Sequence, residues 1–596
     1  MNKRTLVLRL LVAVILFTGV ELQAQSALFL LISPITSLNG MGELGVGLPY
    51  EDHGAVYYNP ANGFLDSPSL SASESSLRMK WLPGLVDDMF LEHAHFRVSY
   101  KMSQSPLQFN LHKYETYLDA GVQQYTDANG TSMGIFRTWF KTNALVLAAK
   151  YSDTTRGVPL EVSYGVASKQ VRQHLTDDAL AENMVFDHGL LVSLPLDLKL
   201  RNDLTLSLKP SLGVSTVNIG TTVSFKGGEQ EDPLPTAARA GIGMSASVPL
   251  GDDWNLFQYR AGNAAMDVLD VPRTSGEQKI EYQKGLGDIN FIKHVIMSDP
   301  DEDPERGHDV EITRGHELSF LDFYSIRFGQ HIDIAGKIIT PQSGISYHSR
   351  GLLNLAYLIT DIHLIHVINQ HVELSYSYAE WTASAYHPLA GTEFDSWNIT
   401  IKNVFGINKS FTAEPKLQLL KLKDALKLSV GGYYPLSVAS GVEPTNEWER
   451  ITGYTAGVET DLKYFRLGFS LTENSFAYHY EELRGGLLRS DTRDEFYQLA
   501  LHAQIPFQLG SRITLLGGFQ SQSPLLHRKV TLFEQSISYT SYEYNYGLRV
   551  GLELKLIERF SVRGSYSYWH DDMDSFFNPD QKVKLSGLIV EGVFGL

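Results

Sequence analysis

The sequence contains no cysteine among its 596 residues. This absence excludes a disulfide framework, a thiolate metal site and a cysteine nucleophile, because each of them requires a thiol. A lipoprotein anchor is excluded for the same reason. Any chemistry of the chain therefore depends on its other side chains.

Basic residues are also in the minority. The sequence has 50 Lys and Arg against 67 Asp and Glu, which gives a formal net charge of −17. A protein that binds nucleic acid through its phosphates presents a basic face, and no basic stripe occurs here. We therefore predict no nucleic-acid partner.

Long apolar runs are missing beyond the N-terminus. The nearest to one, residues 352–367, is interrupted by Asp361, His363 and His366. A membrane-spanning helix needs about 20 predominantly apolar residues. The sequence after the N-terminal segment therefore predicts no transmembrane helix.

The N-terminus has the pattern of a secretory signal peptide. Basic Lys3 and Arg4 precede an apolar run over residues 6–20, and Ala24 supplies the small residue of a cleavage site. We predict a signal peptide over residues 1–24. The alternative is an N-terminal membrane anchor, but the apolar run is short for a span. The mature protein is therefore expected to be exported.

Alternation of apolar and polar residues dominates the C-terminal part. From residue 542 to 556 every even position is apolar and every odd position is polar or small. Side chains of a strand point alternately to its two faces, so one face of this strand is wholly apolar. Similar runs predict about eight strands after residue 420. The other runs cover residues 426–434, 454–460, 465–471, 497–505, 513–519, 560–568 and 588–596.

The connections between these strands alternate in length. Tight turns at residues 461–464, 506–511 and 556–558 separate long polar segments. A transmembrane β-barrel has this arrangement, with short periplasmic turns and long outer loops. A soluble β-sandwich would expose its apolar faces as large patches. We therefore interpret this part as an outer-membrane barrel. The long segments cover residues 435–451, 473–495, 522–541 and 570–581.

Residues 67–405 show the same alternation more loosely. Residues 94–100, for example, place Ala, Phe, Val and Tyr on one face and His, Arg and Ser on the other. We count about fourteen strands here, each close to the ten or so tilted residues that a spanning strand needs. A polar insertion over residues 269–317 is predicted to be an outer loop.

A charged segment without a strand pattern, residues 406–421, separates the two series. We interpret it as a link between a first barrel in residues 25–408 and an eight-stranded barrel in residues 409–596. Residues 397–405 are predicted to be the closing strand of the first barrel. The expected fold class is all-β, with two transmembrane antiparallel barrels. The alternative is a single barrel of about 22 strands.

Residues 40–61, GMGELGVGLPYEDHGAVYYNPA, fit neither a helix nor a strand. Glycine permits backbone angles that other residues avoid, and an Asn-Pro pair restricts the backbone at one point. At the N-terminal entry to a barrel such a segment is predicted to be a hatch that seals or gates the lumen, although a plain turn at the Asn-Pro is an alternative. The predicted hatch and gating residues are Gly40, Gly42, Asn59, Pro60 and Ala61.

Short motifs occur in order through the first half of the chain. They are FLLISP at residues 29–34, GMGELGV at 40–46, YNPA at 58–61, LPGLVDDM at 82–89, YTDANG at 125–130, VNIG at 217–220 and LPT at 234–236. Together they resemble PorV-type outer-membrane proteins of the wider FadL-like barrel group, whose N-terminal hatch carries an Asn-Pro-Ala. The resemblance is best over residues 28–245 and fades toward residue 405.

This resemblance implies a fourteen-stranded outer-membrane barrel that serves type IX secretion. A PorV-type protein binds the folded C-terminal sorting domain of an exported cargo and passes it to the surface-attachment machinery, without enzymatic activity. The implied partners are secretion-system proteins and cargo sorting domains, besides the lipid and lipopolysaccharide of the outer membrane. No cofactor is implied. A FadL-like channel for hydrophobic small molecules is the alternative function.

Other candidate sites carry less weight. Asp87 and Asp88 are candidate partner contacts, although a solvated turn is the simpler interpretation. Acidic residues at 299–305 have the spacing of calcium ligands, but Pro304 stands where that loop needs glycine, so no metal is predicted. The sequence WHDD at 569–572 has no identifiable catalytic partner, and no nucleophile-elbow, zinc-protease or phosphate-loop motif occurs. We predict no catalytic residue.

Overall fold

The computed structural model describes residues 27–402 and 426–595, apart from short stretches that lie mostly between strands, of which 300–309 and 436–447 are the longest. The predicted signal peptide and the predicted link over residues 406–421 lie outside these residues. Within the described part of the chain, no helix is long and apolar enough to span a membrane.

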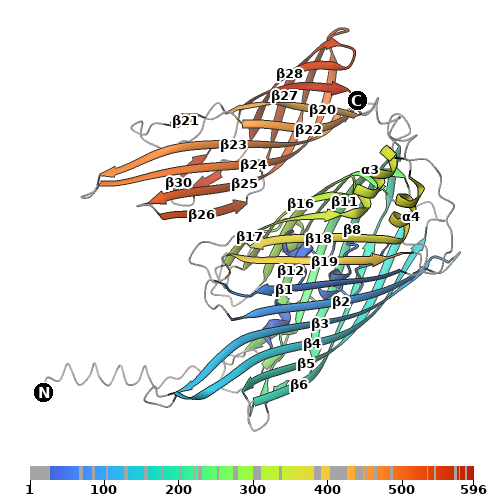
Figure 1. The fold of residues 1–596 in the computed structure, drawn as a ribbon, viewed down its shortest axis with the longest axis vertical. Helices are drawn as coiled ribbons and strands as arrows, with labels where there is room; N and C mark the ends of the chain where they lie inside the picture. Colours follow the sequence, from blue (N-terminus) through green and yellow to red (C-terminus); the bar gives the residue numbers. More distant parts are fainter. Residues whose placement is uncertain are drawn as a thin grey trace.

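Fourteen antiparallel strands close into the first barrel (Figure 1). Each strand pairs with the next strand of the ring. The ring closes where β1 pairs with β19, which places Ser76 opposite Trp397. A closed ring leaves no edge strand with unpaired backbone groups, as a span through lipid requires. The prediction of about fourteen strands is confirmed. The ring consists of β1 Ser71–Lys80, β2 Phe90–Lys101, β3 Leu107–Thr126, β4 Ser132–Asp153, β5 Leu160–Thr176, β6 Ala179–Ser193, β8 Thr205–Gly220, β11 Ala237–Gly251, β12 Trp254–Val268, β15 Glu311–Phe320, β16 Tyr324–Asp333, β17 Ile338–His348, β18 Val372–Trp381 and β19 Thr392–Ile401.

Eight strands of the C-terminal part pair in a second closed order, in which β20 meets β31. Because each ring closes on itself, the alternative of one barrel of about 22 strands is wrong. The ring consists of β20 Leu426–Pro435, β22 Gly453–Asp461, β23 Arg466–Leu483, β24 Leu487–Gln508, β25 Ile513–Leu532, β27 Asn545–Ile557, β28 Phe560–Trp569 and β31 Gly587–Gly595. Short strands outside the two rings are β7 Leu196–Lys199, β9 Val223–Ser224, β10 Glu231–Asp232, β13 Asp270–Pro272, β14 Ile280–Tyr282, β21 Trp448–Arg450, β26 Gln535–Tyr542, β29 Met573–Ser575 and β30 Asn578–Val583.

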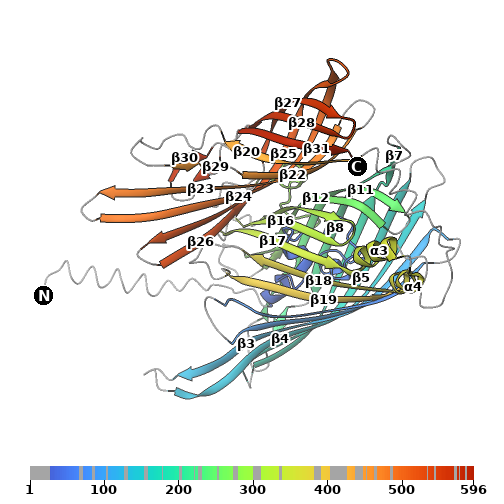
Figure 2. The same ribbon diagram turned by 45° about the horizontal axis from the view of Figure 1, so that its top comes forward.

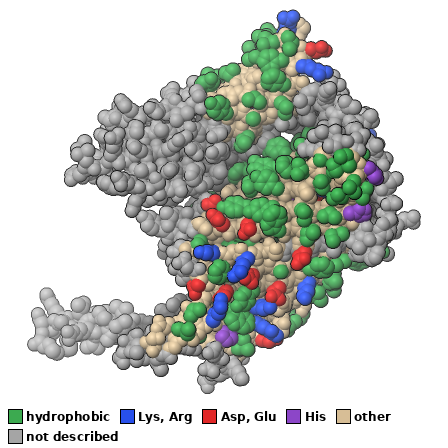
Figure 3. Space-filling view, viewed as in Figure 1, with side chains coloured by type: hydrophobic (Ala, Val, Ile, Leu, Met, Phe, Trp, Pro, Cys, Tyr) green, Lys and Arg blue, Asp and Glu red, His purple; other side chains and the backbone are tan. Residues whose placement is uncertain are grey.

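The strands turn apolar side chains outward and polar side chains inward. On β2, His95 and Arg97 are buried whereas Phe96 is 46% exposed, and on β27 Arg549 is buried whereas Val550 is 51% exposed. A soluble protein has the opposite arrangement, with apolar side chains inside. Apolar side chains outside and polar side chains inside are typical of a transmembrane β-barrel. Figure 3 shows hydrophobic side chains spread over the outer face of the first barrel, with charged side chains across the middle and lower part of this view of the barrel.

The two ends of the first barrel differ. We call the end at which β1 begins and β19 ends the terminal end, and the opposite end the loop end. At the terminal end two helices, α3 Ser349–Thr360 and α4 His363–His371, join β17 to β18. At the loop end the insertion between β12 and β15 carries β13, β14 and the π-helical turn η4 Phe291–Ile296. The insertion ends earlier than predicted, because β15 already begins at Glu311.

Two segments of the second barrel that were predicted to be long loops are paired strands instead, so these two predictions are wrong. Over residues 473–495, β23 and β24 continue to pair as far as Leu483 opposite Leu487. Over residues 522–541, β25 pairs with β26 in the same way. Paired strands satisfy each other's backbone hydrogen bonds in water as well as in lipid. A hairpin in water does not need one apolar face, so the alternation that marks a spanning strand is lost there.

Paired charges fill the interior of the second ring. Arg563 donates to Glu591 over 2.9 Å and to Glu459 over 2.8 Å, and Arg549 donates to Glu591 over 2.7 Å. All four side chains are buried. Buried charges persist only where opposite charges or hydrogen bonds compensate them. The network explains why polar residues occupy the inward positions of these strands.

Candidate functional site

Residues 27–65 lie inside the first barrel, and we call this segment the hatch. It contains η1 Leu28–Leu31, α2 Thr36–Asn39 and η2 His53–Tyr57. Figure 2 shows these short helical turns within the ring of strands. Most hatch residues are buried. The predicted residues Gly40, Gly42, Asn59, Pro60 and Ala61 all lie in this segment.

Backbone contacts join the hatch to the wall of the barrel. Gly42 has a φ of +67°, and a Cβ added to it would lie 2.1 Å from the carbonyl oxygen of Arg314. On the wall, a Cβ added to Gly329 would lie 2.0 Å from the backbone nitrogen of Gly42. Gly40 approaches the Cα of Gly344, which a Cβ would reach at 2.9 Å. Glycine is therefore required on both sides of this contact.

The same contact recurs around the ring. Eight wall glycines would each place an added Cβ within 3.1 Å of a hatch atom, and we call them the glycine band. Glycine weakens a strand unless another backbone must approach it closely, and here the hatch does so. The glycine band was not predicted from the sequence. The sequence nevertheless carried a signal of it, namely a glycine in the middle of successive strands. Its members are Gly165, Gly189, Gly213, Gly241, Gly243, Gly315, Gly329 and Gly344.

Asn59 ties the hatch to itself and to β6. Its side-chain nitrogen donates to the carbonyl of Val46 over 2.9 Å and to that of Leu190 on β6 over 3.1 Å. Its side-chain oxygen accepts a hydrogen bond from the backbone nitrogen of Ala61 over 3.0 Å. The side chain is fully buried. The carbonyl of the intervening Pro60 lies against Gly165 of the glycine band.

Wall side chains also bind carbonyl groups of the hatch. Arg97 donates to the carbonyls of Glu51 and Gly63 over 2.7 and 2.8 Å. Ser215 donates to the carbonyl of Tyr58 over 2.7 Å. An irregular segment cannot pair its own backbone, so buried carbonyls must find donors elsewhere. The polar inward face of the barrel supplies these donors.

Glu43 forms the main ion pair between hatch and wall. Its carboxylate lies 3.3 Å from Nδ1 of His331 on β16 and accepts a hydrogen bond from Gln342 over 3.2 Å. Burial alone raises the pKa of this carboxyl, but the charge of His331 and these hydrogen bonds outweigh it. The pKa of Glu43 therefore lies below its usual value of 4.5.

Acidification should loosen the hatch. Because the pKa of Glu43 is lowered in the closed form, its charge stabilises that form at pH values above its usual pKa of 4.5. This stabilisation is lost as the pH falls through the lower pKa that Glu43 has in the folded protein. We expect the ion conductance of the reconstituted protein to rise below about pH 4.5. Glu43→Gln should flatten this pH profile, whereas Glu393→Gln, on the exposed face of β19, should leave it unchanged. Equal profiles for the wild type and Glu43→Gln would contradict the assignment.

Buried histidines lie at another part of the interface between the hatch and the barrel wall. The ring of His53 in the hatch lies 4.6 Å from that of His95 on β2, and His95 lies 5.3 Å from His112 on β3. Burial lowers the pKa of His53 well below its usual value, and the charge of Arg97 acts in the same direction. His53 is therefore neutral at physiological pH. Within the described residues, no three His, Asp or Glu side chains are arranged to hold a metal ion.

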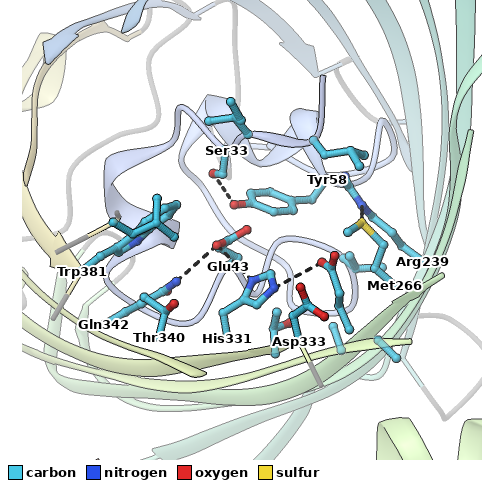
Figure 4. A pocket seen from close by; sticks show the side chains of 18 of the residues that line it. Ser33, Glu43, Tyr58, Arg239, Met266, His331, Asp333, Thr340, Gln342 and Trp381 are labelled. Carbon is cyan, nitrogen blue, oxygen red and sulfur yellow. Dashed lines mark hydrogen bonds and ion pairs between the residues drawn. The ribbon is translucent and has the colours of Figure 1, made fainter. Parts of the chain in front are cut away.

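Within the described residues, a cavity lies on each side of the hatch. A cavity of 220 Å³ faces the loop end, where Asp333 and Trp381 line it from the final residues of β16 and β18 (Figure 4). Trp81, which directly follows β1, also lines it. A cavity of 110 Å³ faces the terminal end and is lined by polar residues such as Glu373 and Arg350. An apolar cluster that includes Trp81 and Trp381 packs hatch residues against the strands at the loop end. We call the larger space the loop-side cavity.

The remaining candidates lie elsewhere. Asp88 accepts a hydrogen bond from the backbone nitrogen of Val122 over 2.9 Å, next to a β-bulge of β3, which gives it a structural role. Asp87 lies outside the described residues, as do residues 300–309 of the acidic loop. Residues 570–572 of the WHDD sequence are also outside them. Asp88 is therefore not part of the hatch.

No family model and no curated protein matches the sequence. Similar solved structures include Ail, the attachment invasion locus protein of Yersinia pestis, at 17% identity over 29% of this chain and 97% of that one, with a TM-score of 0.20. The outer membrane transporter YddB from Escherichia coli is 8% identical over 89% of this chain and 81% of that one, with a TM-score of 0.22. The siderophore receptor PirA from Acinetobacter baumannii has the same identity and coverage, with a TM-score of 0.23. Sequence identities and TM-scores this low carry no argument about function. The fold class follows instead from the strand pairing of this chain.

Proposed function

We propose that the protein is a non-enzymatic outer-membrane component of protein secretion, of the PorV type. In this role it binds cargo sorting domains or the surface-attachment complex of type IX secretion. Export by the signal peptide in residues 1–24 would bring it to the outer membrane of a Gram-negative cell. The motif resemblance suggests this role, and the closed lumen is the observation that supports it best.

A carrier and a channel need different lumens. A channel requires a continuous path, and here the hatch occupies the lumen with backbone contacts to the glycine band and hydrogen bonds from Asn59 and Arg97. Opening such a path would break all of these contacts together. A sealed barrel can still present its rim to a folded partner, so the sealed lumen favours a carrier.

Deleting the gene and analysing the secretome tests the proposal. Proteins with a C-terminal sorting domain should accumulate in the periplasm and disappear from the cell surface. Wild-type protein should restore their export, and so should Asp395→Asn, a change on the exposed face of β19. Normal surface display of this cargo in the deletion strain would refute the secretion role.

A FadL-like channel for hydrophobic small molecules is the second candidate. The apolar part of the loop-side cavity, with Trp81, Trp381 and Leu389, is the observation that favours it. Under this hypothesis the deletion strain should take up a labelled long-chain acid more slowly than the wild type, while its secretome stays normal. The two experiments therefore separate the two functions.

A further inference from the structure

The loop-side cavity has the size of a small-molecule site. It encloses 220 Å³ between the hatch and the loop-end halves of β12, β15, β16 and β17. Sites for drug-sized ligands span about 300–1,000 Å³, so this cavity suits a smaller molecule. Figure 4 shows the side chains of Glu43, Asp333 and Trp381 around this space, from the hatch and from two strands.

Among the described residues of the lining, negative charge exceeds positive charge. The cavity is lined by the carboxylates of Glu43, Glu311 and Asp333, against the guanidinium of Arg239 and the imidazole of His331. Even if the imidazole is protonated, three carboxylates face two cationic groups. A site with this balance attracts a cation and repels an anion.

The positive groups of the lining are already engaged. His331 lies between two carboxylates, with Nδ1 3.3 Å from Glu43 and Nε2 3.2 Å from Glu311. Arg239 donates to the carbonyl of Tyr57 over 3.2 Å and stacks over the ring of Tyr58 at 5.4 Å. Both cationic groups are therefore held in place by the protein and are poorly placed to receive an anionic ligand.

Aromatic rings and unpartnered polar atoms complete the site. Trp81 and Trp381 meet edge to face with their ring centroids 5.8 Å apart. Within the described residues, the buried indole nitrogen of Trp381 and the side-chain oxygen of Gln342 have no hydrogen-bond partner. Buried polar atoms are nearly always paired, and both side chains belong to residues that line the cavity. Indole rings also bind organic cations through their faces.

From this charge, shape and aromatic lining we propose that the loop-side cavity binds a small organic cation. The ligand carries an ammonium or guanidinium group on a short apolar or aromatic body. The cationic group lies near Asp333 and Glu311, and the body packs against Trp81 and Trp381. This site is independent of the secretion role proposed above, and it disfavours the carboxylate of a long-chain acid.

Binding of phenethylamine to the full-length protein in detergent tests the site by calorimetry. Two molecules with the same ring serve as matched probes, namely neutral 2-phenylethanol and anionic phenylacetate. A hydrogen bond to a charged group contributes about 1.5–3 kcal/mol, so 2-phenylethanol should bind at least about tenfold more weakly than phenethylamine. Phenylacetate should not bind. Equal binding of the three probes, or no binding of phenethylamine, would overturn the proposal.

Variants locate the site. Asp333→Asn and Glu311→Gln should each weaken phenethylamine binding about tenfold, because each removes one negative charge from the lining. Asp395→Asn removes an equal charge from the exposed face of β19 and should leave binding unchanged. Unchanged affinity in both Asp333→Asn and Glu311→Gln would place the cation elsewhere and refute the assignment. The probe series on the wild-type protein decides the question even if one variant does not fold.

Discussion

Gly42→Ala and Gly329→Ala should each unseat the hatch and open the first barrel to ions. The two residues form opposite sides of one contact, in which an added methyl group would come within 2.1 Å of Arg314 or 2.0 Å of Gly42. The methyl group cannot be accommodated by a rotamer change, because the atoms it meets belong to the backbone. The hatch must therefore move away from the wall.

The expected cost differs between the two variants. Gly42 has a φ of +67°, where an L-residue costs about 1–2 kcal/mol more than glycine. Overpacking adds about 1–3 kcal/mol to this strain. Gly329→Ala carries only the overpacking cost, because no positive φ is involved. Gly42→Ala should therefore open the lumen more often than Gly329→Ala.

Conductance in planar bilayers and thiol labelling measure the opening. The wild type should be closed, and both variants should conduct. Because the chain has no cysteine, Ser33→Cys places a single reporter at a buried position of the hatch, where labelling requires the hatch to open. Gly517→Ala is the control, since an added Cβ there meets no atom within 4 Å. Closed channels and slow labelling in both variants would show that the hatch does not depend on the glycine band.

The spanning strands were predictable because lipid imposes a simple local rule. A spanning strand needs one apolar face, so the alternation in residues 542–556 and 94–100 located strands directly. This need for an apolar face no longer applies where the strand extends beyond the lipid. The paired extensions of β23 and β24 have no such constraint, and their residues were assigned to loops for that reason.

The hatch was predictable as a segment but not as a set of contacts. Its glycines and Asn-Pro indicated irregular backbone, and local sequence carries that information. The partners of these residues lie far along the chain, as Gly329 does for Gly42 and Leu190 does for Asn59. Such pairs depend on which strands the ring brings around the hatch. Only the mid-strand glycines left a sequence signal of this arrangement.

Replacing Asn59 should release the hatch without adding bulk. In Asn59→Ala the carbonyls of Val46 and Leu190 lose their donor, and the backbone nitrogen of Ala61 loses its acceptor. An unsatisfied buried group costs about 1–3 kcal/mol, so the hatch should lose about 2–4 kcal/mol after partial relaxation. Asn59→Asp should cost more, because it places a charge against two carbonyl oxygens.

Hydrogen exchange of the hatch amides measures this loss. Because 1.4 kcal/mol corresponds to a factor of ten, exchange in Asn59→Ala should accelerate about 30- to 1,000-fold. Pro60→Ala is the neighbouring control, since the carbonyl that lies against Gly165 is kept and proline has no backbone N–H to lose. Its exchange should change less than about tenfold. If Asn59→Ala exchanged no faster than Pro60→Ala, the three hydrogen bonds of Asn59 would not be what holds the hatch in the lumen.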